Sequence, residues 1–303
     1  MPPLLPPAAT ARQPTRRGRT AAEFPGRRGR PPPSAPLQPH YRRVLACMAG
    51  HDLPGPVFGI CWDGAGRGPD GTLWGGEFLR VEQGGFVRAG HFRTFPLPGP
   101  EAAAREPRRC ALGAVYGMEG DDLFARADEP VLGRFSDGER ILLRSALARR
   151  FNTASTSSAA RLIAAAASLA GVRQWASFEG QEARELEDAV DETETSAYPC
   201  PLRGRAPFVL DWHPLLAALR EDVRTDVPAG RIAARFLRAL VEAIAQAAAR
   251  GGLREVVLAG ACFENGWLDP RPARSLRADG FAPHGPSGRR ERPVRSRAGG
   301  GRT

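Results

Sequence analysis

The sequence predicts a mixed α/β fold, and three observations lead to that class. Three apolar runs between Val57 and Phe95 are joined by glycine-containing turns, as consecutive strands are. Several stretches between residues 109 and 190 carry apolar residues at helical spacing. A further apolar run, Arg254 to Ala259, leads into a glycine turn, which is typical of a buried strand in an α/β protein.

The first three runs predict an antiparallel meander. They extend from Val57 to Trp62, from Leu73 to Val81 and from Phe86 to Phe95. Short segments rich in glycine separate them, which is the pattern of strands that are neighbours both in sequence and in the sheet.

Helical spacing of apolar residues predicts four helices after the meander, at 109–118, 138–149, 157–170 and 179–190.

The C-terminal part of the chain alternates strands and helices. Phe208 to Leu210 predicts a short strand, and an Ala/Leu/Phe stripe from Ile232 to Ala249 predicts a long helix. The buried strand Arg254 to Ala259 follows, and a short helix is expected from Phe263.

The two ends of the chain differ from its centre in composition. Residues 1–36 carry seven Arg against one Glu and residues 283–303 carry six Arg against one Glu, so the centre is close to neutral although the whole chain carries +10. These arginines lie among Pro, Gly, Ser and Ala, a composition that cannot bury enough apolar surface to fold. We expect disordered tails at 1–36 and 283–303, and no functional binding of nucleic acid.

Composition also excludes several classes of protein. All 43 basic residues are arginine, which excludes a P-loop lysine and a Schiff-base lysine. No stretch approaches the roughly 20 apolar residues of a membrane span, and the N-terminus lacks the apolar run of a signal peptide. The five cysteines have no C-x-x-C spacing and are expected to be reduced and buried. The sequence therefore indicates a cytoplasmic protein without a membrane anchor.

The most informative segment covers residues 59–77, Gly-Ile-Cys-Trp-Asp-Gly-Ala-Gly-Arg-Gly-Pro-Asp-Gly-Thr-Leu-Trp-Gly-Gly-Glu. An apolar run ends here in Asp63 and a glycine-dense turn. Gly64, Gly66 and Gly68 allow the main chain to approach a phosphate closely, and Asp63 could hold Mg²⁺ or a sugar hydroxyl. The alternative is a β-hairpin whose turn needs Asp and Gly for geometry alone.

A second glycine turn follows the run that ends at Ala259. A strand, a glycine turn and a helix would place Asn265 near a helix N-terminus, where an anion or a ribose binds. The alternative role of Asn265 is a helix cap. We expect this turn and the Asp63 turn to face each other across a cleft.

Several motifs occur in a fixed order along the chain. Besides residues 59–77, they are the segments 95–99, 105–108, 156–162, 178–183 and 256–265. Together they resemble the "WDG…G.DG..WGGE", "FPLPGG…REPWR", "TSSxGRLFDA", "YEGQAA" and "VxLSGGxFxN" motifs of the hydrogenase-maturation carbamoyltransferase family (HypF type), in its C-terminal metal-binding domain. Order and spacing agree from about Leu37 to Phe281.

This resemblance implies a duplicated, ribonuclease-H-like fold of the actin-like ATPase type, here incomplete at both ends. Residues 37–150 and 151–282 would be the first and second parts of that domain. In the family, a carbamoyl group passes through a carbamoyl-adenylate to a cysteine thiol of a partner hydrogenase maturation protein. ATP or carbamoyl-adenylate is therefore the implied cofactor, and the carbamoyl-acceptor maturation protein is the implied partner.

The matching motifs also imply site residues. Asp63 and Glu179 are the implied catalytic residues. The implied nucleotide- and substrate-binding residues are Gly64, Gly66, Gly68, Asp70, Ser157, Ser158, Gly180, Gly260 and Asn265.

The chain departs from the family at its metal ligands. The family motif "QHHxAH" supplies two histidines one helical turn apart, so that both imidazoles face one ion. Here Pro39 and Arg43 stand at these two positions, with His40 between them. A third ligand, the aspartate of "PPNDGG", has no counterpart after Phe281. We therefore assign no metal ligand and expect the family's iron or zinc not to bind.

The nucleotide motifs are also altered. Ala160 and Ala164 replace the glycine and the aspartate of "GRLFD", and Ala261 replaces the second glycine of "SGG". Three functions stay open: an impaired carbamoyltransferase of hydrogenase maturation, a catalytically silent remnant that binds a partner or a nucleotide, and a related O-carbamoyl or threonylcarbamoyl transferase.

Overall fold

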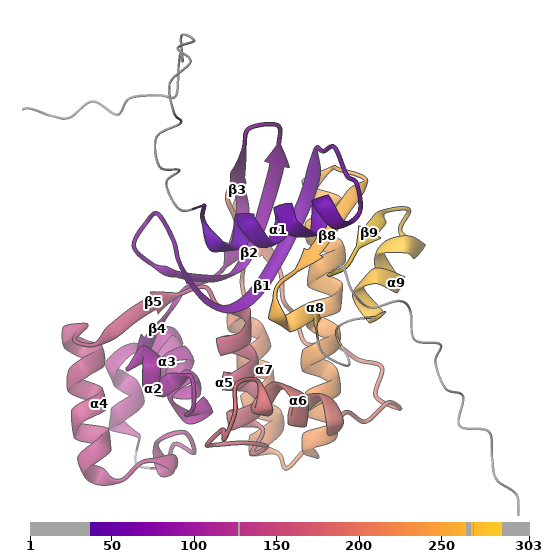
Figure 1. Cartoon of the computed structure of the whole chain (residues 1–303). Coiled ribbons are helices and arrows are strands. Elements are labelled where there is room, and N and C mark those ends of the chain that lie inside the picture. The colour runs from indigo at the N-terminus through magenta and orange to yellow at the C-terminus, as the bar shows by residue number, and fades with distance from the viewer. Residues whose placement is uncertain (1–36, 127, 265–267, 269, 287–303) are drawn as a thin grey trace, which may run out of the picture. The chain divides into compact units, whose positions relative to one another are not determined.

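A mixed β-sheet runs through the centre of the described structure (Figure 1). The computed structural model describes residues 37–126, 128–264, 268 and 270–286. The strands are β1 (Val57–Arg67), β2 (Leu73–Glu82), β3 (Gly85–Phe92), β4 (Phe95–Pro98), β5 (Thr153–Thr156), β6 (Leu202–Arg203), β7 (Phe208–Leu210), β8 (Glu255–Ala259) and β9 (Ala282–His284). Across the sheet their order is β6-β7-β3-β2-β1-β8-β9, and β4 and β5 pair with each other beside β2.

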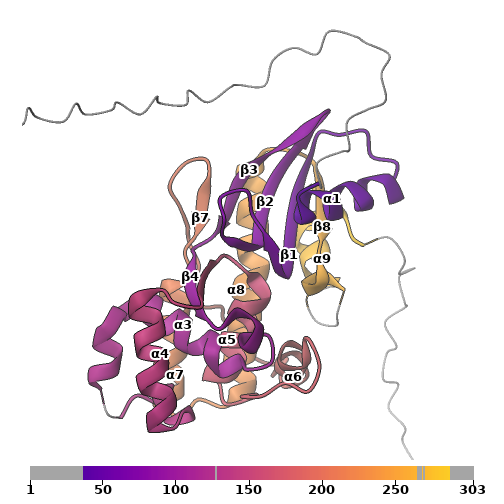
Figure 2. The ribbon, with the colours of Figure 1, turned by 60° about the vertical axis from the view of Figure 1, so that its left-hand side comes forward.

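Helices cover both faces of this sheet. They are α1 (Pro39–Gly50), α2 (Pro100–Ala103), α3 (Pro107–Glu119), α4 (Asp137–Arg149), α5 (Ala159–Leu169), α6 (Gln181–Asp188), α7 (His213–Arg224), α8 (Ala229–Gly251) and α9 (Pro270–Ala278). Short 3-10 turns cover Gly120–Ala125, Leu132–Arg134 and Ala261–Phe263. Helix α1 lies against one face, whereas α5 and α8 lie on the other side (Figures 1 and 2).

Strand β1 is packed from both sides because successive side chains of a strand point to opposite faces. Phe58, Ile60 and Trp62 belong to the large hydrophobic cluster that includes α5, α7 and α8. Val57 and Cys61 belong to the smaller cluster beneath α1. Packing on both faces fixes the position of the C-terminal end of β1, where the glycine-dense segment begins.

The predicted meander is confirmed, since β1 pairs antiparallel with β2 and β2 with β3. The third predicted run, Phe86 to Phe95, is wrong at its end. The chain leaves the sheet after Phe92 and starts β4 at Phe95. The backbone of Arg93 is held instead by the β7 segment, because its N–H donates to Leu210 O at 2.9 Å and its carbonyl accepts from Trp212 Nε1 at 2.6 Å.

The predicted helices are confirmed within a few residues as α3, α4, α5, α6 and α8. Helix α5 starts at Ala159 rather than residue 157 because the Ser158 side chain caps it. The helix expected from Phe263 is wrong: a single 3-10 turn, Ala261–Phe263, ends there instead.

The C-terminal boundary of the folded centre lies further along the chain than predicted. Pro283 and His284 belong to β9, which pairs in parallel with β8, and His284 Nε2 lies 2.6 Å from Glu255 Oε2. The tail predicted from residue 283 therefore starts too early. The predicted tail at 1–36 and residues 287–303 lie outside the described residues, and the division at residue 150 stays a prediction.

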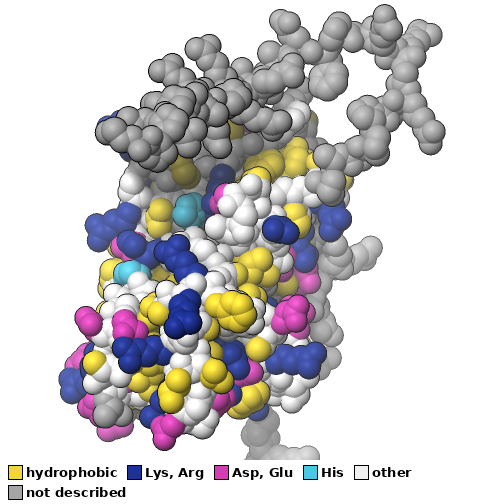
Figure 3. All heavy atoms as spheres, turned by 90° about the vertical axis from the view of Figure 1, so that its left-hand side faces the viewer, with side chains coloured by type: hydrophobic (Ala, Val, Ile, Leu, Met, Phe, Trp, Pro, Cys, Tyr) yellow, Lys and Arg dark blue, Asp and Glu magenta, His cyan; other side chains and the backbone are white. Residues whose placement is uncertain are grey.

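The surface of the described part mixes charges of both signs. Figure 3 shows basic and acidic side chains interspersed on one face of the molecule. Within the described ranges, none of the helices is both long and apolar enough to cross a membrane.

The packing of α3 against β4 gives a test of the fold. A Cβ at Gly113 in α3 would lie 2.0 Å from Pro96 O, which is backbone and cannot move aside, whereas a Cβ at Gly138 in α4 would meet nothing within 4 Å. We expect Gly113→Ala to lower the free energy of unfolding by about 2–3 kcal/mol. Gly138→Ala should raise it by about 0.5–1 kcal/mol, because alanine favours the helix.

Urea unfolding followed by circular dichroism measures both changes. Gly138→Ala is the matched control, since it makes the same substitution in another helix. A Gly113→Ala chain as stable as the parent would contradict the close contact of α3 with β4.

Candidate functional site

The two glycine turns lie next to each other at one edge of the sheet. Strand β8 pairs in parallel with β1, with Cys61 opposite Ala259, so both strands end at the same edge. The expectation that the turns face each other across a cleft is therefore wrong, because their strands are direct neighbours in a single sheet. Gly260 has φ of 98°, and a Cβ there would lie 2.1 Å from Trp62 O. Glycine is required for this close approach.

The structure divides the glycine-dense segment into two parts. The β1–β2 pairing shifts register between Trp62 and Gly66, so Asp63 and Gly64 form an irregularity that we call the Asp63–Gly64 bulge. Beyond it the hairpin resumes, with Gly66 opposite Trp74. The two readings of this segment thus apply to different residues: the hairpin covers its second half, and the bulge consists of the partly exposed Asp63 and the buried Gly64.

Gly66, Gly68 and Asp70 have structural neighbours in α1 or in the hairpin. A Cβ at Gly66 would lie 2.7 Å from His40 Cε1, and one at Gly68 would lie 2.1 Å from Trp74 Nε1. Asp70 Oδ1 accepts hydrogen bonds from the Thr72 backbone N–H at 3.0 Å and from Trp74 Nε1 at 3.0 Å. The nucleotide-binding role assigned to these three residues stays a prediction.

Ser158 fastens the N-terminus of α5 to the Asp63–Gly64 bulge. Its Oγ lies 2.8 Å from Asp63 O and 2.5 Å from Gly64 O, and it accepts from the Arg161 backbone N–H at 3.1 Å. The positive end of the α5 dipole therefore lies at the bulge, which is the arrangement that favours an anion.

Ser157 holds the same helix end to a buried carboxylate. Its Oγ donates to Glu77 Oε1 at 2.5 Å, while Arg88 Nε lies 2.6 Å from Glu77 Oε2. Glu77 is 0% exposed, and the Gly75 N–H also donates to it at 3.2 Å. Ser157 is thus occupied by β2 rather than turned toward the bulge.

Glu179 reaches the bulge from the start of α6. A Cβ at Gly64 would lie 3.3 Å from Glu179 Oε1 and 3.6 Å from Arg161 Nη2. Gly180, with φ of 81°, is the N-cap residue of α6 and turns the chain into that helix. Of the predicted site residues, the structure therefore brings Asp63, Gly64, Ser158 and Glu179 together. Asn265 lies outside the described residues.

Charged residues at the bulge that were not among the predicted ligands complete the site. Arg43 Nε lies 2.5 Å from Asp63 Oδ2, and the Arg161 side chain is buried beside Gly64. Burial raises the pKa of Glu182, whose Oε2 is buried without a hydrogen-bond partner. The position of Arg161 within the "TSSxGRLFDA"-like segment was the signal that could have identified it.

The residues on α1 do not fit iron or zinc. Proline has no donor atom, and the Arg43 guanidinium already pairs with the Asp63 carboxylate. His40 is buried, with Nδ1 2.8 Å from Gln38 Nε2 and Nε2 without a partner, and burial lowers its pKa. In the ranges that the structure describes, no three His, Cys, Asp or Glu side chains form a metal-binding group. Absence of metal from the purified chain stays a prediction.

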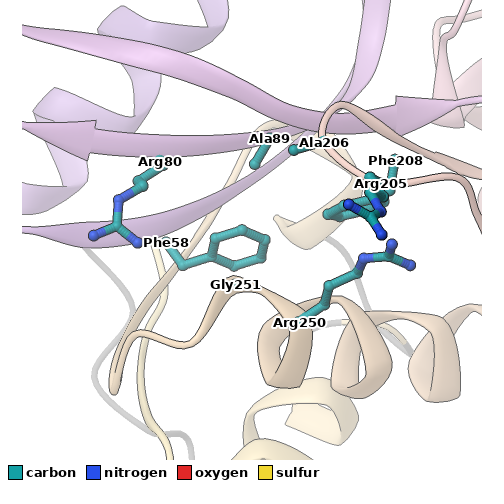
Figure 4. Close-up of a pocket in the computed structure, with 8 residues that line it drawn as sticks. All are labelled: Phe58, Arg80, Ala89, Arg205, Ala206, Phe208, Arg250 and Gly251. Atoms are coloured by element: carbon teal, nitrogen blue, oxygen red, sulfur yellow. The ribbon is translucent and has the colours of Figure 1, made fainter.

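A surface hollow lies away from the bulge, near the other end of β1. It is lined by Phe58, Arg80, Ala89, Arg205, Ala206, Phe208, Arg250 and Gly251. Figure 4 shows Arg80 on one side of Phe58 and the Arg205 and Arg250 guanidinium groups on the other. Arg80 pairs with Glu82, and the Arg250 guanidinium donates to Gly204 O. None of the residues that line the hollow is a predicted site residue.

Comparison with known proteins identifies the relatives of this chain. Residues 59–288 match the family model described as "Carbamoyltransferase, Kae1-like Domain, second subdomain". Carbamoyltransferase HypF of Synechocystis sp. is 35% identical over 82% of this chain and 34% of that protein. The HypF homolog of Cupriavidus necator is 36% identical over 82% of this chain and 65% of that protein.

Solved structures give the same result. The crystal structure of full-length HypF in its phosphate- and nucleotide-bound form has a TM-score of 0.77 and 32% identity, over 83% of this chain and 39% of that one. HypF of T. kodakarensis has a TM-score of 0.72 and 26% identity, over 82% of this chain and 34% of that one. These similarities confirm the resemblance and the predicted fold class, and this chain spans only part of the length of each relative.

The cysteines give a test of the site chemistry. All five are free, four are buried, and burial raises the pKa of Cys47 to about 11 and those of Cys110 and Cys200 to about 12. Because the thiolate is the reactive form, we expect the native chain at pH 8 to react with a thiol reagent at least about a hundredfold more slowly than the unfolded chain.

Titration with a chromogenic disulfide, with and without guanidinium chloride, measures this difference. The partly exposed Cys262, which follows Gly260 and Ala261, is the sensitive position, and burial raises its pKa as well. Fast native labelling at Cys262 would contradict the expectation and would identify a reactive thiol at the site.

Proposed function

Because this chain belongs to the HypF carbamoyltransferase family, we propose that it takes part in ATP-dependent carbamoyl transfer of hydrogenase maturation, with impaired transfer. The observation that carries the proposal is the Asp63–Gly64 bulge held by Ser158 against the N-terminus of α5. A glycine-containing bulge next to a helix N-terminus is suited to a phosphate group. ATP or carbamoyl-adenylate would bind there.

The carbamoyl acceptor is proposed to be a cysteine thiol of a partner maturation protein. Among the described residues, every thiol has a raised pKa, which disfavours this chain as its own acceptor. Glu179, whose Oε1 lies beside Gly64, is the carboxylate placed to act on a group bound at the bulge. A cytoplasmic location belongs to the same proposal.

A second candidate is a catalytically silent protein that binds a nucleotide or a partner. The ion pair between Arg43 and Asp63 supports this candidate, because the guanidinium is bound to a carboxylate that could otherwise take part in catalysis. The transfer assay below separates the two. O-carbamoyl and threonylcarbamoyl transfer are less well supported, because the paired histidines and the "YPGGP" motif of these enzymes are absent from the sequence.

Nucleotide binding by the bulge is tested with Asp63→Ala. Asp63 accepts from the Gly64 N–H at 2.9 Å and pairs with Arg43, so its removal should disorder the bulge. We expect the Kd for ATP, measured by calorimetry, to rise about tenfold, the value of one charge-assisted hydrogen bond. Asp70→Ala is the matched control, because the partners of Asp70 are Thr72 and Trp74 of the hairpin and Arg88 of β3.

Tight ATP binding that is indifferent to Asp63→Ala would show that the pocket lies elsewhere. The same samples are then supplied with carbamoyl-adenylate and a cysteine-containing acceptor peptide. We expect weak transfer at most. A complete lack of transfer together with ATP binding would favour the silent binding protein over the impaired enzyme.

A further inference from the structure

Helix α4 carries hydrophobic side chains on two opposite faces. Leu143 and Leu147 are buried in the large hydrophobic cluster, as the inner face of a surface helix should be. Ile141 and Leu142, by contrast, are 70% and 71% exposed, and Phe151, which follows the end of α4, is 74% exposed. Hydrophobic residues scattered singly over a surface are ordinary, whereas several close together are typical of an interaction surface.

The exposed side of α4 forms one continuous face. Ile141, Ser145 and Ala148 follow one another at intervals of four and three residues, so they lie on one side of the helix, with Leu142 and Arg149 beside them. We call these five exposed residues the α4 outer face. Ser145 and Ala148 are small, so the backbone of another helix can approach closely here. Figure 3 views the molecule from the side on which α4 lies and shows hydrophobic side chains at the surface between charged ones.

The two ends of α4 carry opposite charges. Asp137 lies in the first turn with 93% of its side chain exposed, and Arg149 is exposed in the last turn. Asp137 pairs with Arg140 of its own helix at 3.3 Å, but such an exposed pair contributes little and is easily exchanged. A helix with an acid at its start and a base at its end is complementary to an antiparallel copy of itself, because each acid then lies beside the base of the other copy.

We propose that two copies of this chain associate through their α4 outer faces, with the two helices antiparallel about a two-fold axis. A single register satisfies both the charges and the shape of the face. It places Asp137 opposite Arg149 of the second copy, and the same alignment places Ile141 opposite Ser145 of the second copy, a large side chain against a small one. The symmetry repeats each of these pairs, so the outer face is complementary to itself.

The expected association is weak. The outer face is one helix wide, which is less than the roughly 1,200–2,000 Å² of total surface that stable complexes bury. Burial of Ile141 and Leu142 in both copies is the main favourable contribution, whereas the exposed ion pairs mainly set the direction of the helices. We expect a Kd on the order of 10–100 µM.

Sedimentation velocity of the full chain, at concentrations from well below to well above that Kd, tests the proposal. The parent should change from monomer to dimer as its concentration rises. Ile141→Glu buries a charge in the contact and should raise the Kd at least about tenfold. Val87→Glu is the matched control, because Val87 is also β-branched and is 65% exposed, but lies in β3, far from α4 in Figures 1 and 2. It should leave the Kd unchanged.

Charge variants test the direction of the helices. Asp137→Arg and Arg149→Asp each place like charges opposite each other in the antiparallel register, so each variant alone should dimerise about fivefold more weakly than the parent, or less. An equimolar mixture of the two variants should recover the affinity of the parent, because one copy then carries arginine and the other aspartate at both positions. Circular dichroism of each sample verifies that the variants are folded.

The outcomes decide the proposal without bearing on the proposed function, because no residue of the α4 outer face was assigned to the candidate site. A chain that stays monomeric at every concentration would overturn it and would leave this face to a protein of another sequence. A dimer that Ile141→Glu leaves intact would overturn it too, since the contact would then lie on another surface. So would a dimer that neither charge variant weakens, because the antiparallel register would be wrong.

Discussion

Two adjacent serines hold the helical layer to the sheet, and the geometry of the site depends on them. Ser157 is tied to the buried Glu77 of β2, and Ser158 to the carbonyl groups of Asp63 and Gly64. Neither bond joins residues near each other in sequence, so both specify tertiary structure. Together they bring the first turn of α5, and Arg161 with it, to the end of β1. Without this connection, the positive end of the helix would have no fixed relation to the bulge.

At the site, the Glu77 and Asp63 carboxylates each lie beside an arginine side chain. In a chain that contains no lysine, every permanent positive charge on a side chain is a guanidinium, which stays charged when buried and can bond two acceptors at once. Glu77 and Asp63 each have one such partner, Arg88 and Arg43 respectively. Arg161 is also buried, and its guanidinium and the Glu179 carboxylate both lie beside Gly64.

Much of the fold was predictable from the sequence, because strand and helix periods and glycine turns are local signals. The meander, the long helix α8 and helix α4 follow from such signals, the two helices from the helical spacing of their apolar residues. What could not be predicted depends on register and on pairing between distant segments. The irregularity after Trp62 separates the bulge from the hairpin, and parallel pairing of β8 with β1 places Gly260 beside Trp62.

The candidate site was predictable to a similar degree. Asp63, Gly64, Ser158 and Glu179 lie in recognisable motifs and meet in space. The burial of Arg161 and the pairing of Arg43 with Asp63 could not be read in advance, because a sequence does not show whether an arginine is buried or which carboxylate it approaches. The same limit applies to Asp70, whose partners are Thr72, Trp74 and Arg88.

The pair formed by Arg43 and Asp63 also constrains how this site can change. A histidine at position 43 would recover one imidazole but would leave the Asp63 carboxylate without its neighbouring cation until a metal ion arrived. The proline at position 39 offers no second ligand to hold that ion. A single Arg43→His substitution would therefore remove the guanidinium beside the carboxylate without supplying the second ligand for a metal ion. A metal centre beside Asp63 would thus require changes at more than one position of this segment.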